Sequence, residues 1–210
     1  MKINKLLFPL LLASARGAAF GAVGCDLNDP DRDVARLFPA SSGYKTQYLS
    51  VKTAGGEKLL ARIEDRLGDK FKGLYETIDV PYTLYLIYKG KEKIGYIHGV
   101  NQKGEYGGIQ VFLSLGLDGK IKAFYIQKLT SKAAAELRSK TFGAQFAGLS
   151  LKDLADYDPA AGKAPASSPA TKLKSPSSAA EKDFQHVMRA VKKNLILMDE
   201  FVFSKENKTP

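Results

Sequence analysis

Few side chains in this sequence could take part in covalent or metal chemistry. There is one cysteine, Cys25, and there are two histidines, His98 and His186. Cysteine catalysis needs a reactive thiolate beside a base, and a zinc site needs three or four His, Cys or acidic ligands. The chain has no glycine motif for nucleotides and no Cys-x-x-Cys-His haem motif. We therefore predict no catalytic residue and no metal site, so that any redox chemistry must come from a bound cofactor.

Cys25 follows a segment that is typical of export signals. Two lysines precede an apolar run over residues 6–15, and this run is too short to span a bilayer. Residues 22–25 (Ala-Val-Gly-Cys) resemble a bacterial lipobox, in which the cysteine receives a lipid. We predict a signal peptide over residues 1–24 and an exported lipoprotein, anchored in a membrane through Cys25 on the periplasmic or cell-surface side. The alternative is an ordinary signal peptide cut near Ala19, which leaves a free thiol.

The charge of the chain favours an anionic partner. The sequence has 32 Lys and Arg residues against 22 Asp and Glu residues, a net charge of +10. The basic residues are scattered, without a run of five or more and without zinc-finger spacing. We therefore expect no nucleic-acid partner, and we expect the basic surface to lie against an anionic membrane.

The hydrophobic pattern predicts an α+β fold. Alternating or β-branched and aromatic segments predict strands, and the second and third of them read as a hairpin; these segments are 44–51, 82–88, 94–98, 109–117 and 121–128. Apolar residues at helical spacing predict helices; these segments are 30–39, 57–67, 131–146, 150–153 and the stretch from Ser178. Because the strands cluster instead of alternating with helices, we expect an antiparallel sheet flanked by helices.

The same pattern divides the chain into four parts after the signal peptide. Residues 25–157 form the α+β domain. Residues 158–177 are rich in Pro, Ala, Ser and Lys, which predicts a flexible linker. Residues 178–203 form a C-terminal helix whose apolar stripe packs back on the domain. Residues 204–210 are a polar tail.

Five short segments together resemble a known family. In chain order they are Val34–Pro39, the hairpin 82–97, Gly-Glu-Tyr-Gly-Gly-Ile over 104–109, Leu-Asp-Gly-Lys-Ile over 117–121, and Phe-Gly-Ala-Gln-Phe-Ala-Gly over 142–148. This order, over about residues 33–197, is similar to that of the FMN-binding domain. The domain occurs in periplasmic subunits of Rnf and Na⁺-translocating NADH:quinone reductase complexes and in the regulator of nitrous oxide reduction.

The resemblance implies a fold like that of FMN-binding domains, with FMN as cofactor. It implies that Tyr106, Gly107, Gly108 and Thr130 line the site. Glycines at a strand start would let the backbone approach a flat ligand closely, although a flexible entry to the strand would explain them equally well. The implied partners are a membrane electron-transfer complex or a cytochrome.

The two segments that hold flavin in the family differ here. Residues 129–134 (Leu-Thr-Ser-Lys-Ala-Ala) replace Glu-Thr-Pro-Gly-x-Gly and keep only Thr130. Residues 175–178 (Ser-Pro-Ser-Ser) replace Ser-Gly-Ala-Thr, whose Thr is joined to FMN in covalent members. Ser178 could replace that Thr, but Pro176 removes an N–H, and Ser178 with Glu181 also forms a capping-box pattern. We therefore favour non-covalent FMN; the alternative is a flavin-free accessory or assembly lipoprotein of a membrane complex.

Overall fold

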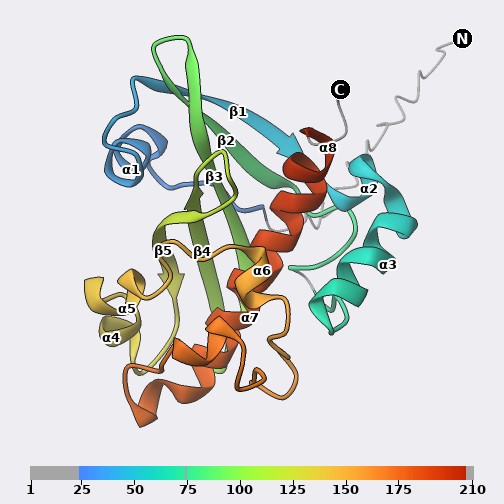
Figure 1. Ribbon diagram of the computed structural model, residues 1–210, viewed down its shortest axis with the longest axis vertical. Coiled ribbons are helices and arrows are strands. Elements are labelled where there is room, and N and C mark those ends of the chain that lie inside the picture. Colours follow the sequence, from blue (N-terminus) through green and yellow to red (C-terminus); the bar gives the residue numbers. More distant parts are fainter. Residues whose placement is uncertain (1–23, 74, 207–210) are drawn as a thin grey trace, which may run out of the picture.

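The computed structural model describes residues 24–73 and 75–206, so the predicted signal peptide lies, except for Gly24, outside the described residues. Five strands form one sheet, in which each strand pairs antiparallel with its neighbour in the chain (Figure 1). The strands are β1 (Gly43–Leu49), β2 (Tyr82–Lys89), β3 (Glu92–Lys103), β4 (Gly108–Leu115) and β5 (Ile121–Leu129). The predicted α+β class, with an antiparallel sheet flanked by helices, is confirmed.

One long helix covers one face of the sheet, and a second helix packs beside it. The long helix α7 (Glu181–Met198) packs on β3 and β4, and α3 (Gly56–Leu67) packs against α7 (Figure 1). The other helical elements are short. They are α1 (Pro30–Leu37), α2 (Val51–Ala54), α4 (Ala134–Leu137), α5 (Lys140–Ala144), α6 (Leu151–Leu154), the 3₁₀ turns η1 (Pro169–Lys172) and η2 (Ser178–Ala180), the π-helical η3 (Asp199–Phe203) and α8 (Ser204–Glu206). No described helix is both long and apolar enough to cross a bilayer.

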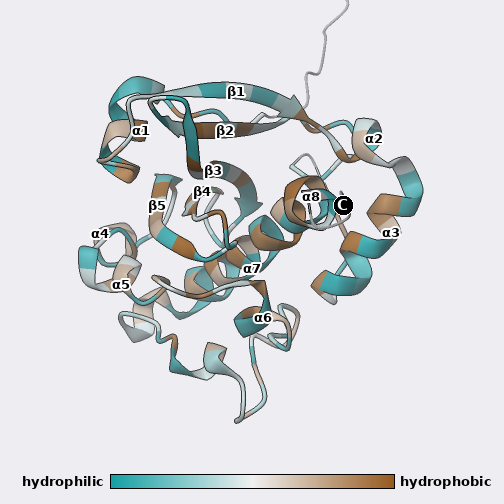
Figure 2. Cartoon of the chain, turned by 45° about the horizontal axis from the view of Figure 1, so that its top comes forward, coloured by the Kyte–Doolittle hydropathy of each residue, from teal (hydrophilic) through white to brown (hydrophobic). Residues whose placement is uncertain are grey.

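The sheet has a hydrophobic core on each face. Successive strand residues point to opposite faces, so Leu84 belongs to the larger core under α7, whereas Tyr85 belongs to a smaller core with α1 and Cys25. The inner strand β2 is largely apolar, while the edge strand β1 is mostly hydrophilic and exposed (Figure 2). Both cores therefore lie over the middle of the sheet.

Several elements end where the pattern did not predict. The segment 131–146 forms two short helices, because Ser139 caps α5 by accepting a hydrogen bond from the N–H of Phe142. Strand β1 stops at Leu49, because Ser50 forms a capping box with Thr53 at the start of α2. The segment predicted as a linker contains η1 and buries Ala170 and Leu173 against the larger core.

Candidate functional site

The turn between β3 and β4 meets the end of β5. The turn is closed by a 2.7 Å hydrogen bond from the N–H of Gly104 to the carbonyl of Gly107. A Cβ atom on Gly107 would lie 2.9 Å from the Cβ atom of Thr130. The N–H of Thr130 also donates to the carbonyl of Gly108 at 3.3 Å. The structure thus brings together three of the residues that the resemblance assigns to a flavin site.

The same turn is tied to the start of α7. The buried carboxylate of Asp183 accepts a 3.0 Å hydrogen bond from the N–H of Glu105, and Lys182 pairs with the Glu105 carboxylate at 2.9 Å. Ser178, which opens η2, is exposed. The predicted capping box of Ser178 is absent, because α7 begins at Glu181 after the 3₁₀ turn and has no side-chain cap. The Ser178 hydroxyl therefore does not cap α7.

Exposed aromatic and basic groups stand beside the turn. The ring of Tyr106 is 49% exposed, and the ammonium of Lys132 lies 5.2 Å from its centroid. A Cβ atom on Gly108 would lie 3.0 Å from the hydroxyl of Tyr75. Neither Lys132 nor Tyr75 was predicted; Tyr75 comes from an irregular loop without a sequence signal. The space beside Gly107 and Gly108 is filled by Thr130 and Tyr75, so the close approach expected of a ligand is made by the chain itself.

A buried ionic network lies under the middle of α7. Lys193 is fully buried, and its ammonium donates to the Glu76 carboxylate at 2.5 Å and to the carbonyl of Asn101 at 2.7 Å. Arg189 donates to the same carboxylate at 2.6 Å. Burial opposes the ionisation of Glu76, but the two cations prevail and lower its pKa to about 2. Burial also lowers the pKa of Lys193, to about 8. These groups hold α7 to β3 and to the loop before β2.

Arg189 has no free donor for a ligand, although it lines a groove of about 510 Å³. A guanidinium carries five N–H donors. All five are used, by Asp69 (from Nε), Glu76 and Gln102 (from Nη1), and the Lys70 carbonyl and Glu76 (from Nη2). The network therefore stabilises the packing of α7 and is not an anion-binding site.

His98 is fully buried on β3, as a structural histidine would be. Its Nδ1 lies 2.9 Å from Oδ1 of Asn194, and its Nε2 has no hydrogen-bond partner among the described residues. Burial lowers its pKa to about 4, although Asn194 opposes this. The ring is therefore neutral at pH 7, and the folded state must take up a charge in its core when the ring is protonated.

We expect the protein to lose stability in acid because of His98. The folded pKa lies below the unfolded value of about 6.5, so the stabilisation is present above pH 6.5 and is lost as the pH falls towards 4. The loss by pH 4 is about 3 kcal/mol. Urea unfolding at pH 7 and pH 4 measures it, with His98→Gln as the control that does not titrate. Equal losses in both proteins would contradict the assignment.

Cys25 lies inside the smaller core. Its side chain has an exposed fraction of 0%, and burial raises the pKa of the thiol to about 12. The segment around it is held on the sheet by hydrogen bonds: from Asn101 to the Gly24 carbonyl, from Thr83 to the Asp26 carboxylate, and from the Leu27 N–H to the Tyr85 hydroxyl. A lipid on this sulfur does not fit the folded arrangement, so the predicted anchor requires residues 24–28 to leave the sheet.

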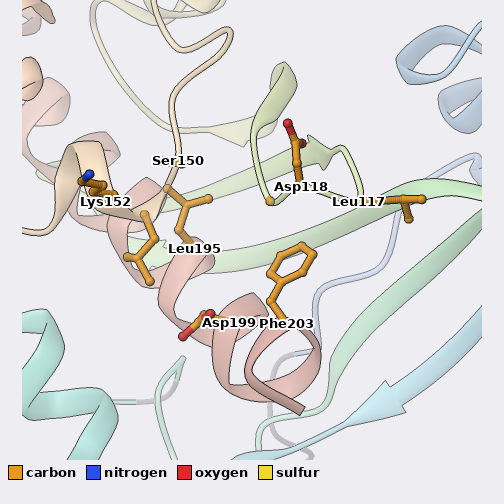
Figure 3. A pocket seen from close by; sticks show the side chains of 9 residues that line it. Leu117, Asp118, Ser150, Lys152, Leu195, Asp199 and Phe203 are labelled. Atoms are coloured by element: carbon orange, nitrogen blue, oxygen red, sulfur yellow. The ribbon is translucent and has the colours of Figure 1, made fainter. Parts of the chain in front are cut away.

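A separate cavity of about 300 Å³ lies at the far end of α7 (Figure 3). It is bordered by Leu117 and Asp118 before β5, Ser150 and Lys152 at α6, and Leu195, Asp199 and Phe203 at the end of the last helix. π-Helical turns often mark functional sites. Here the Asp199 carboxylate is already engaged, by Arg66 at 2.7 Å and by Ser204 at 2.9 Å. None of the predicted site residues borders this cavity.

Comparison with known proteins found no matching family model and no matching curated protein. The similarity to FMN-binding domains therefore depends on the five sequence segments.

Proposed function

We propose that this protein is an exported flavoprotein that binds FMN non-covalently beside the β3–β4 turn and takes part in electron transfer at the cell envelope. A membrane electron-transfer complex or a cytochrome would be its partner. The proposal is supported by one observation above all: Gly107 lies against Thr130, and the turn is tied through Glu105 to the start of α7. Segments 78 residues apart in the chain meet at this end of the sheet.

The exposed groups there suit a flat, phosphate-bearing ligand. The half-exposed ring of Tyr106 offers a stacking face. Lys132 offers a cation for the phosphate, and the exposed hydroxyl of Thr130 offers a hydrogen bond. FMN would supply the redox chemistry, and the chain would bind and orient it. Because Thr130 and Tyr75 fill the space at the glycines, we place the ligand over exposed side chains, and we propose no covalent bond to Ser178.

FMN titration, followed by quenching of flavin fluorescence, tests this site. We expect saturable binding by the wild-type chain and a Kd about 5- to 150-fold weaker for Tyr106→Ala, because stacking on an aromatic side chain contributes about 1–3 kcal/mol. Tyr48→Ala is the matched control: Tyr48 is 69% exposed but lies on the edge strand β1, which pairs with neither β3 nor β4. Equal weakening by both substitutions would contradict the proposed position.

A flavin-free accessory lipoprotein of a membrane complex is the second candidate. It is favoured because Thr130 and Tyr75 occupy the space beside Gly107 and Gly108. Failure of the wild-type chain to quench FMN at any concentration would overturn the first proposal in favour of this one.

Both candidates place the protein outside the cytoplasm. Attachment through a lipid on Cys25 requires the segment 24–28 to be released from the sheet. An exported chain cut before Gly24, with Cys25 kept in the smaller core, is compatible with the folded arrangement.

A further inference from the structure

A basic groove runs along the edge strand β5, between α1 and α5. It has a volume of about 610 Å³. In Figure 1, β5 lies between α1 on one side and the α4–α5 pair on the other. The floor and the far wall are made of apolar or small residues: Ala123, Phe124, Ile126, Leu137, Gly143, Ala144 and Ala147.

The charged residues that line this groove are all basic: Arg36, Lys122, Arg138 and Lys140. Two of them are fixed by the protein. The Arg36 guanidinium pairs with Asp33 at 3.0 Å and lies 3.8 Å from the centroid of Tyr125, and Arg138 donates to the backbone carbonyls of residues 126 and 127. The groove therefore combines a positive rim with an apolar floor.

Lys122 and Lys140 are available to a ligand. Both are exposed, and neither forms an ion pair with any acid in the described part of the chain. Among the described residues, no acidic side chain lines the groove to compete for them. An anion bound between these two lysines would gain from both charges.

We propose that this groove binds an anionic phospholipid, with its phosphate between Lys122 and Lys140 and one acyl chain along the apolar floor. Inorganic phosphate alone would leave that floor unused. Ala123 and Tyr125 pack against the smaller core, whereas Phe124, Ile126 and Leu137 pack with the larger one, so the groove follows the edge of the sheet and not one face. This inference is independent of FMN binding.

Vesicle flotation of the full chain tests the proposal. We would compare vesicles of phosphatidylcholine with vesicles of equal parts phosphatidylcholine and phosphatidylglycerol. Residues before Gly24, three of which are basic, and a lipid on Cys25 contribute equally in the wild type and in the variants, so a change in the ratio of the two binding constants reports the groove. Lysines near an anionic surface contribute about fivefold each. We therefore expect Lys122→Gln/Lys140→Gln to lower this ratio about 25-fold.

Two further variants separate the groove from general charge. Lys91→Gln/Lys152→Gln removes two exposed lysines that lie outside the groove. We expect this control to keep most of the preference for phosphatidylglycerol. Ala147→Phe fills the floor without changing the charge, and we expect it to lower the preference as well.

Three outcomes would overturn the proposal. Equal losses in the two double variants would assign the binding to overall charge. An unchanged preference for phosphatidylglycerol in Ala147→Phe would show that no acyl chain occupies the groove. If both groove variants keep their vesicle binding but lose binding to an oligo-glutamate peptide, the groove is assigned to an acidic protein segment.

Discussion

Replacing Glu76 with glutamine should lower the free energy of unfolding by about 3–5 kcal/mol, because it leaves a buried ammonium and a buried guanidinium without their shared carboxylate. Lys193 has no exposed surface, and Glu76 is 7% exposed, so water cannot replace the lost partner. Arg189 would keep Asp69, at 2.8 Å. Lys193 would keep only the Asn101 carbonyl among its observed acceptors. Most of the loss in the free energy of unfolding therefore comes from Lys193.

Urea unfolding at pH 7 measures this loss, with Glu57→Gln as the control. Glu57 is an exposed carboxylate on α3 that forms no ion pair in the described structure. The double variant Glu76→Gln/Lys193→Met has no buried Lys193 ammonium. We therefore expect its loss in the free energy of unfolding to be smaller than the sum of the losses in the two single variants. A loss below about 1 kcal/mol in Glu76→Gln would mean that water reaches this cluster.

Replacing Gly99 with alanine should expel Cys25 from the smaller core. The added Cβ atom would lie 2.4 Å from a ring carbon of Phe112 and 2.7 Å from the Cys25 sulfur. Both distances are too short for the packed arrangement, and such overpacking costs about 1–3 kcal/mol. Residue 99 lies in the middle of β3, paired with Phe112 of β4, so the backbone cannot move away. The segment around Cys25 is the part that can yield.

The rate of thiol modification in native buffer measures this release. We expect a slow reaction in the wild-type protein, because burial keeps the thiol protonated and covered, and a faster one in Gly99→Ala. Gly43→Ala on β1 is the control, since no atom of the described residues lies within 4 Å of the added atom. Equal thiol reactivity in the wild type and Gly99→Ala would contradict the position of Cys25. A protein without a reactive thiol even when unfolded would indicate that Cys25 is modified, as a lipoprotein requires.

The sequence by itself determined the regular parts of the fold. The β-branched and aromatic residues before and after the predicted turn at residues 89–93 indicate the hairpin, which the structure contains as β2 and β3. The apolar stripe of the last helix is buried in the structure, as Phe184, Val187 and Val191 show. Such features depend on neighbours within one element, and hydrophobic periodicity reports these directly. The antiparallel order of β2 to β5 follows because short turns join these successive strands, whereas residues 50–81, with α2 and α3, join β1 to β2.

Only the tertiary structure decided which polar groups are buried. Lys193 lies on the last helix outside the apolar stripe that predicts its buried face, and its partner Glu76 comes from an irregular loop 117 residues away. No local pattern reports a contact at that separation. The burial of Cys25 also depends on a distant residue. The sulfur fits into the smaller core because Gly99 has no side chain. Periodicity identifies the apolar face of an element, whereas the pairing of buried charges depends on how distant segments meet.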